Sequence, residues 1–129
     1  MSDPLVLVAD DDDDILLLVT TRLRRDGFEV VAARDGDEAL ALARAQRPHV
    51  AVLDIGMPGL DGLEVLAQIR ADDELRDTRV LLLTAKAQES DVRRGYTAGA
   101  DAYVKKPFSP AELSARVRDL VDGTTGADV

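Results

Sequence analysis

Five short apolar runs, separated by segments with helical spacing, constrain the fold of this chain more than any other feature of its sequence. A short apolar run bounded by turn residues is typical of a buried strand. The runs are Leu5 to Ala9, Phe28 to Ala33, His49 to Leu53, Val80 to Leu83 and Ala102 to Val104. Because parallel strands need crossover connections, strands that alternate with helices predict a parallel sheet with helices on both faces.

The segments between and after these runs carry signals for five helices. Gly27 is expected to end the first helix, and Asp35 can cap the second. The tetrapeptide Ser109-Pro110-Ala111-Glu112 predicts a capping box with proline in the first helical turn. The helices are expected from Ile15 to about Asp26, after Asp35, after Asp61, from Ser90 to Ala98 and after Ser109.

The composition is that of one folded domain. A chain of 129 residues can bury a sizeable core, and its 46% hydrophobic and 32% charged residues exclude both a disordered chain and a membrane protein. Residues 1–122 are expected to form the domain, and residues 123–129 a flexible tail or linker stub. The amino terminus lacks the basic region and apolar stretch of a signal peptide, which predicts a cytoplasmic location.

Charge and residue types narrow the chemistry further. The chain has no cysteine and a single histidine, which excludes thiolate metal sites and histidine metal clusters. Any bound metal must therefore be held by oxygen ligands. A net charge of −9 opposes nucleic-acid binding by this domain alone.

Polar and charged side chains follow the predicted strands at the point where each strand ends. These residues are Asp10 and Asp11 after the first strand, Asp54 after the third, Thr84 after the fourth and Lys106 beyond the fifth. The carboxyl ends of parallel strands meet at one edge of the sheet, and open α/β sheets bind ligands there. Carboxylates gathered at this edge repel one another unless a cation neutralises them, and oxygen ligands in a wet cleft suit Mg²⁺.

Asp54 is the candidate nucleophile at this edge. It ends an apolar run and is followed by a loop that contains Pro58, Gly59 and Gly62. An ionised aspartate needs no general base, so Asp54 could accept a phosphoryl group and form an acyl phosphate. Mg²⁺ and Lys106 would stabilise the charge on the transferring group. The alternative role for an aspartate in this position is to cap a turn.

Four motifs occur in one order along the chain. They are VADD at Val8 to Asp11, VLDIGMPGLDG at Val52 to Gly62, LLTA at Leu82 to Ala85 and GADAYVKKPF at Gly99 to Phe108. Together they resemble the receiver domain of two-component response regulators, over nearly the whole chain. The resemblance implies a doubly wound, flavodoxin-like (βα)5 fold, that is, five strand–helix units, with five parallel strands in the order 2-1-3-4-5.

The resemblance also implies roles for individual residues. Asp54 is then the phospho-acceptor, Asp11 a direct Mg²⁺ ligand and Asp10 a ligand through water, with the carbonyl of Gly56 also on the metal. Lys106 corresponds to the lysine that contacts the phosphoryl group.

A switch and two modulators are implied as well. Thr84 and Tyr103 correspond to the switch pair of the family. Gly56 stands where a larger side chain is common, which opens the phosphoryl group to water, and Lys86 lies over the same opening. Both residues are therefore candidate modulators of dephosphorylation.

Asp10 to Asp14 form a run of five aspartates, so the sequence offers several candidate pairs for the metal site. Asp10 and Asp11 are chosen for the site because they directly follow the apolar strand. Asp12 to Asp14 are expected to begin the first helix, where the helix dipole favours negative charge. A cis peptide bond is predicted between Lys106 and Pro107, because the lysine must turn back into the cleft just before a proline.

The function implied by the resemblance is a phosphorylation-activated signalling switch. Its phosphodonor would be a histidine kinase or a histidine phosphotransfer protein, with Ile15 to Val19 and the last helix as candidate docking elements. The chain would catalyse its own phosphoryl transfer and a slow autodephosphorylation. An unknown output partner is expected at the face formed by the fourth helix, fifth strand and fifth helix, and phosphorylation-dependent homodimers are a further expectation.

Two other functions are weighed against this one. A phosphatase or phosphotransferase of the haloacid dehalogenase-like class also forms an aspartyl phosphate, but that class would require a second aspartate where Gly56 stands. A pseudo-receiver would bind partners without phosphorylation, and the full set of acidic, hydroxyl and lysine residues argues against it.

Overall fold

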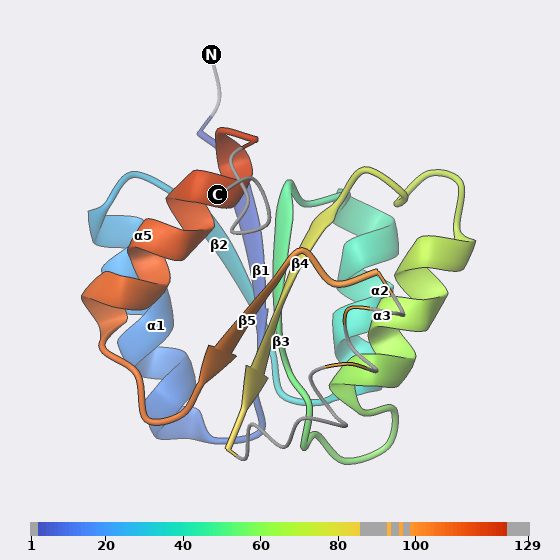
Figure 1. Ribbon diagram of the computed structural model, residues 1–129, viewed down its shortest axis with the longest axis horizontal. Coiled ribbons are helices and arrows are strands. Elements are labelled where there is room, and N and C mark those ends of the chain that lie inside the picture. Colours follow the sequence, from blue (N-terminus) through green and yellow to red (C-terminus); the bar gives the residue numbers. More distant parts are fainter. Residues whose placement is uncertain (1–2, 86–92, 94–95, 97–98, 124–129) are drawn as a thin grey trace.

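The computed structural model describes residues 3–85, 93, 96 and 99–123 and contains one five-stranded sheet (Figure 1). The strand order is β2-β1-β3-β4-β5, and every neighbouring pair is parallel. The strands are β1 (Leu5–Ala9), β2 (Glu29–Ala33), β3 (Val50–Asp54), β4 (Arg79–Thr84) and β5 (Ala102–Lys105). The predicted parallel sheet and its strand order are confirmed.

Helices cover both faces of the sheet (Figure 1). The helices are α1 (Asp13–Arg25), α2 (Gly36–Gln46), α3 (Gly62–Ala71) and α5 (Pro110–Val121). Figure 1 shows α1 and α5 together on one face and α2 and α3 on the other. The helix predicted from Ser90 to Ala98 falls mostly outside the described residues. Two residues of this range are described, Arg93 and Tyr96, and both are helical. No helix in the described part of the chain is long and apolar enough to cross a membrane.

The apolar strands fill two core layers, one on each face of the sheet. Successive side chains of a strand point to opposite faces. In β1, Leu7 and Ala9 join the layer under α2 and α3, whereas Val6 and Val8 join the layer under α1 and α5. Both faces of the central strands are therefore buried, which explains why they read as continuous apolar runs rather than as alternating ones.

Several strand boundaries differ from the prediction by one residue. Phe28 precedes β2, and its amide donates to the carbonyl of Leu23 in the turn that ends α1, while its ring lies in the core. β3 extends through Asp54, because Asp54 pairs in register with Leu83 of β4. The candidate nucleophile is thus the last residue of a strand that is held on both sides.

Short polar side chains set the helix starts. Asp12 caps α1, Asp35 caps α2, Asp61 caps α3 and Ser109 caps α5, each by accepting a backbone N–H bond. The capping box predicted at Ser109 is half formed, since the Glu112 amide donates to the serine but no return bond is found among these described residues. The complete box lies instead at the start of α3.

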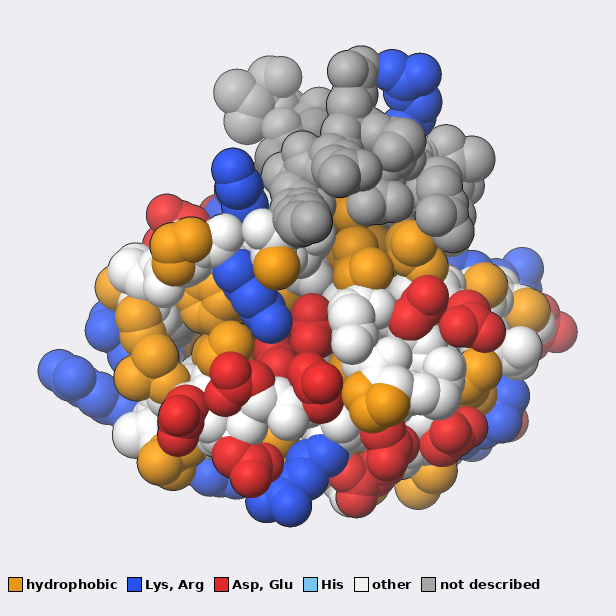
Figure 2. All heavy atoms as spheres, turned by 90° about the horizontal axis from the view of Figure 1, so that it is seen from below, with side chains coloured by type: hydrophobic (Ala, Val, Ile, Leu, Met, Phe, Trp, Pro, Cys, Tyr) orange, Lys and Arg blue, Asp and Glu red, His pale blue; other side chains and the backbone are white. Residues whose placement is uncertain are grey.

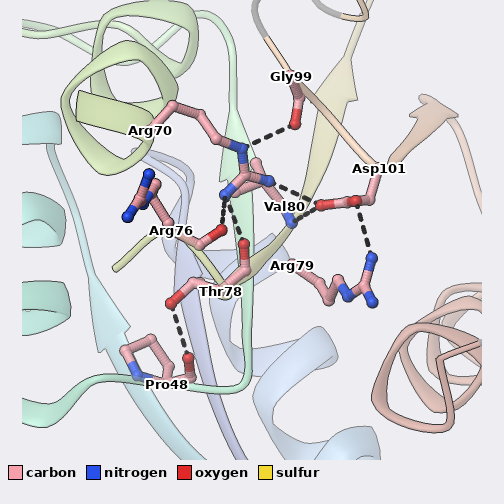
Figure 3. Close-up of polar contacts among 8 residues, drawn as sticks. All are labelled: Pro48, Arg70, Arg76, Thr78, Arg79, Val80, Gly99 and Asp101. Carbon is pink, nitrogen blue, oxygen red and sulfur yellow. Dashed lines mark hydrogen bonds and ion pairs between the residues drawn. The ribbon is translucent and has the colours of Figure 1, made fainter. Parts of the chain in front are cut away.

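Arg70 joins the end of α3 to the start of β4 and β5, at the edge of the sheet where the strands begin (Figure 3). Its guanidinium donates to the carbonyls of Gly99, Arg76 and Thr78 and to the carboxylate of Asp101 at 2.8 Å. Asp101 also accepts a bond from the backbone amide of Val80 at 2.8 Å. One planar cation therefore satisfies three carbonyls and a partly buried carboxylate.

Replacement of Arg70 is expected to destabilise the protein. Arg70→Gln should lower the free energy of unfolding by about 2–3 kcal/mol, because hydrogen bonds to charged groups contribute roughly 1.5–3 kcal/mol. Arg47→Gln is the control, since Arg47 forms a well-exposed pair with Glu74 and exposed pairs contribute below about 1 kcal/mol. Urea unfolding of both variants measures the difference, and equal losses would contradict the structural role of Arg70.

Candidate functional site

The carboxyl ends of the strands bring the predicted site residues to one edge of the sheet. Asp10 follows β1, Asp54 and Thr84 end β3 and β4, and Lys106 follows β5. Backbone hydrogen bonds hold Asp10 and Lys106 in place: the Asp10 amide donates to the carbonyl of Ala33, and the Lys106 amide donates to the carbonyl of Thr84. Figure 2 shows the molecule from this side, with acidic side chains gathered at the centre of the face.

Three carboxylates form a group with the geometry of a metal site. Ligand oxygens of Asp10, Asp11 and Asp54 all lie within 4.8 Å of one another. Asp10 and Asp54 are buried and Asp11 is exposed, so the group is open to solvent on one side. All the donors are carboxylate oxygens and the group is partly wet, which fits Mg²⁺, an ion that keeps several waters and takes one or two carboxylates.

Lys106 lies between the two buried carboxylates. Its Nζ atom is 3.0 Å from Asp10 Oδ2 and 3.4 Å from Asp54 Oδ1. Burial alone would lower the pKa of Lys106, but its hydrogen bond to Asp10 and the charges of Asp54 and Asp10 outweigh burial and raise that pKa. Lys106 therefore stays charged, within reach of any group attached to Asp54.

Asp54 is held in place and electrostatically destabilised in its charged form. Burial is the main cause that raises the pKa of Asp54, followed by the charge of Asp10, while Lys106 and the Gly56 amide act in the opposite direction. The Gly56 amide donates to Asp54 Oδ1 at 3.2 Å. This bond orients one carboxylate oxygen and leaves the other available for a new bond.

The space next to Asp54 is open on the side of Gly56. Gly56 is exposed, and within the described part of the chain a Cβ atom built there would meet only Asp54 Oδ1, at 3.9 Å. No side chain of residue 56 thus shields the carboxylate from water. The other predicted modulator, Lys86, lies outside the described residues.

The later part of the aspartate run, Asp12 to Asp14, begins the first helix as predicted. Asp12 is the N-cap of α1, and its side chain accepts bonds from the amides of Asp14 and Ile15. Asp13 and Asp14 lie in the first helical turn. The Asp12 amide also donates to Asp10 Oδ1 at 2.9 Å. The residue that caps α1 therefore also orients a carboxylate of the candidate metal site.

Thr84 and Tyr103 lie on neighbouring strands close to this group. Thr84 is buried and pairs in register with Lys105, two residues after Tyr103. The ring of Tyr103 contacts the ring of Tyr96, with 5.9 Å between centroids. Tyr96 was not identified from the sequence, because a contact between a helix and a strand leaves no local pattern.

The Lys106–Pro107 peptide bond is cis, as predicted.

Comparison with known proteins identifies the family. The model of the response regulator receiver domain matches residues 6–118. The chain belongs to this family. The transcriptional regulatory protein PrrA of Mycobacterium tuberculosis is 48% identical to this chain over 121 residues. These residues cover 94% of this chain and 51% of PrrA.

Further relatives are also response regulators or transcriptional regulatory proteins. The alkaline phosphatase synthesis transcriptional regulatory protein PhoP of Bacillus subtilis is 43% identical to this receiver chain and covers 90% of it, with 48% of PhoP aligned. The structure of the chemotaxis response regulator CheY4 of Vibrio cholerae has a TM-score of 0.87 at 32% identity, over 92% of this chain and 99% of that one. The receiver chain thus spans about half the length of these curated relatives and nearly all of CheY4.

Replacement of single aspartates should separate metal binding from helix capping. Asp11→Ala is expected to weaken Mg²⁺ binding strongly, because Asp11 belongs to the carboxylate group. Asp12→Ala should leave Mg²⁺ binding nearly unchanged and destabilise the fold by about 1 kcal/mol through loss of the cap. Mg²⁺ titrations and urea unfolding of both variants test this, and equal losses of Mg²⁺ affinity would show that the register is wrong.

The raised pKa of Asp54 predicts how stability changes with pH. A carboxyl whose pKa is higher in the folded state than its ordinary 3.8 makes the protein less stable as pH rises through the interval between those two values. Asp54→Asn should therefore be more stable than wild type at pH 7 without Mg²⁺, and this difference should shrink as pH falls through the same interval.

Mg²⁺ provides the control for that measurement. A ligand at 100 times its Kd stabilises the folded state by about 2.7 kcal/mol, so saturating Mg²⁺ should favour the wild type over the variant. A pH-independent stability difference between the two proteins would contradict this account of Asp54.

Proposed function

We propose that this chain is a phosphorylation-activated switch in which Asp54 accepts a phosphoryl group from a phosphohistidine donor. The observation that carries the proposal is the placement of Lys106, whose ammonium lies within 3.4 Å of both buried carboxylates in a three-carboxylate group. Membership of the receiver family supports the same conclusion, because receiver domains receive phosphoryl groups from histidine kinases.

The side chains at this edge suit an in-line displacement. A carboxylate oxygen of Asp54 attacks phosphorus, the bond between phosphorus and the donor's imidazole nitrogen breaks, and that nitrogen keeps the electron pair. Lys106 pairs with an oxygen of the transferring group and stabilises its charge. Asp11 and Asp54, Asp10 through water and the Gly56 carbonyl would hold Mg²⁺, which supplies further positive charge to the phosphoryl oxygens.

The open space beside Gly56 bears on how long the phosphoryl group persists. Water can approach a group on Asp54 from this side, since among the described residues only the Asp54 carboxylate is found within 4 Å of a Cβ at residue 56. We propose that Gly56 favours autodephosphorylation, with Lys86 as a second modulator of the attacking water.

Thr84 and Tyr103 are proposed to transmit the phosphorylated state. A phosphoryl group replaces one negative charge with nearly two and adds strong acceptors, which draw the Thr84 hydroxyl towards Asp54. Tyr103, on the adjacent strand, can then turn into the space that Thr84 leaves. The face formed by the predicted fourth helix, β5 and α5 changes shape as a result, and we place output binding there.

The phosphodonor is proposed to dock on α1. Leu17 and Leu18 are exposed by 68% and 53%, and they border a pocket lined also by Arg22, Arg25 and Pro110 of α5. Asp14 and Thr21 complete the lining of this pocket. The apolar centre and the two arginines suit a helical protein surface with apolar and acidic residues. For the domain itself we propose the range 1–122, because α5 ends at Val121 and Asp122 caps it.

Phosphorylation by a small donor tests the proposal directly. Incubation with acetyl phosphate and Mg²⁺ should add the mass of one phosphoryl group to the wild type and none to Asp54→Asn, whose amide keeps the shape but is not a nucleophile. Asp12→Asn is the matched control and should still be modified, because asparagine also caps helices. Intact-protein mass spectrometry gives the result, and a mass gain by Asp54→Asn would refute the acceptor.

Thr84→Ala should accept the phosphoryl group but respond weakly. We expect fluoroberyllate to shift the backbone amide resonances from Ala102 to Arg118 in the wild type and to shift them much less in Thr84→Ala. Thr84→Ser keeps the hydroxyl and serves as the control. Identical shifts in all three proteins would show that Thr84 does not couple the site to the output face.

A further inference from the structure

The loop between β3 and α3 carries part of the candidate metal site and is closed on itself. It runs through residues 55–61 and includes Gly56, whose amide binds Asp54. The Gly62 amide at its end donates to the Ile55 carbonyl at its start, at 3.2 Å. The Ile55 amide in turn donates to Leu83 of β4 at 2.9 Å, which ties the start of the loop to the sheet.

The far part of this loop rests on the first residue of α2. A Cβ atom built on Gly36 would lie 1.9 Å from the carbonyl oxygen of Leu60 and 2.6 Å from its carbonyl carbon. Real Cβ atoms essentially never come closer than 3.0 Å to another heavy atom. The loop can therefore take this position only because residue 36 has no side chain.

Two further contacts hold the same stretch of loop. Leu60 packs against the core layer that α2 and α3 share. A Cβ atom built on Gly62 would lie 2.6 Å from the carbonyl oxygen of Asp54, so the start of α3 sits directly on the backbone of the candidate phospho-acceptor. The chain from Leu60 to Gly62 thus lies between α2 and Asp54.

We infer that Gly36 is a positioning residue for the Asp54 site, acting through Leu60 and the loop that it supports. The inference rests on the proposed function, because it concerns the Mg²⁺ that Asp54 and Gly56 are proposed to bind. Gly36 itself belongs to α2, and the three nearest atoms to a Cβ built there all belong to Leu60, which is not proposed to bind the metal or the phosphoryl group.

The size of the displacement supports this role. A methyl group on residue 36 lies 1.9 Å from the Leu60 carbonyl oxygen, so the two must separate by roughly 1.5 Å to reach the 3.4 Å of an ordinary contact. Mg²⁺ requires nearly octahedral ligands at about 2.0–2.1 Å, with a tolerance of roughly 0.2 Å. The separation needed at Leu60 is several times this tolerance, so even a fraction of it transmitted along the loop to Gly56 moves the Gly56 carbonyl relative to the Asp54 carboxylate, which β3 holds in place.

The test compares Gly36→Ala with Gly27→Ala. Gly36→Ala is expected to weaken Mg²⁺ binding by about 10- to 100-fold, the range typical for residues that orient metal ligands. It should also shift the amide resonances of Gly56 and of its loop in metal-free protein, a readout that does not depend on phosphorylation.

Gly27→Ala is the matched control at the opposite edge of the sheet. Gly27 has a φ of +98° and no described residue within 4 Å of a built Cβ, so alanine there strains the backbone without contacting the loop. It should lower the thermal stability and leave the Mg²⁺ affinity unchanged. A general loss of stability is thereby separated from a displaced site.

Leu60→Ala gives a second test if Gly36→Ala does not fold. It removes the loop's apolar anchor without inserting any atom, and it should weaken Mg²⁺ binding and shift the same loop resonances. Wild-type Mg²⁺ affinity in every folded variant at residues 36 and 60 would overturn the inference and leave the proposed function intact. Absence of Mg²⁺ binding by the wild type would instead overturn the proposed function.

Discussion

The burial of two like charges, those of Asp10 and Asp54, is the constraint on which the rest of this site depends. Removing a carboxylate from water is expensive, and a second carboxylate beside it increases the electrostatic penalty. Lys106 is the cation that the structure places against both, at 3.0 and 3.4 Å. Among the described residues of this group, one ammonium faces three carboxylates, so the group retains an excess of negative charge. Such an excess favours the binding of a divalent cation.

Much of this arrangement follows from local sequence, and the exceptions are contacts between distant segments. The strand that ends at Ala9 locates Asp10 and Asp11, and the polar residues after it cap α1 as their spacing predicts. The inclusion of Asp54 in β3 depends on its pairing with Leu83. The approach of Gly36 to Leu60 likewise depends on how α2 and the loop after β3 meet, and no pattern of neighbouring residues records such a meeting.

The two edges of the sheet differ in how far their charges are neutralised. At the edge where the strands begin, Arg70 and Asp101 pair at 2.8 Å, and the remaining groups of both side chains are largely satisfied by backbone partners. At the carboxyl edge, the carboxylates of Asp10, Asp11 and Asp54 face the single ammonium of Lys106, so negative charge is in excess among these described groups. The starts of β4 and β5 are joined to α3 by a charged network, whereas no such network joins the described residues at their carboxyl ends to a helix.

The contact between Tyr96 and Tyr103 has a practical consequence. These are the chain's two tyrosines, and it contains no tryptophan. Almost all of the near-ultraviolet absorption and fluorescence of the protein therefore comes from one pair of neighbouring rings, with centroids 5.9 Å apart. The relative orientation of those rings governs how strongly their transitions interact. The protein thus carries an intrinsic optical reporter beside β5, readable without any label.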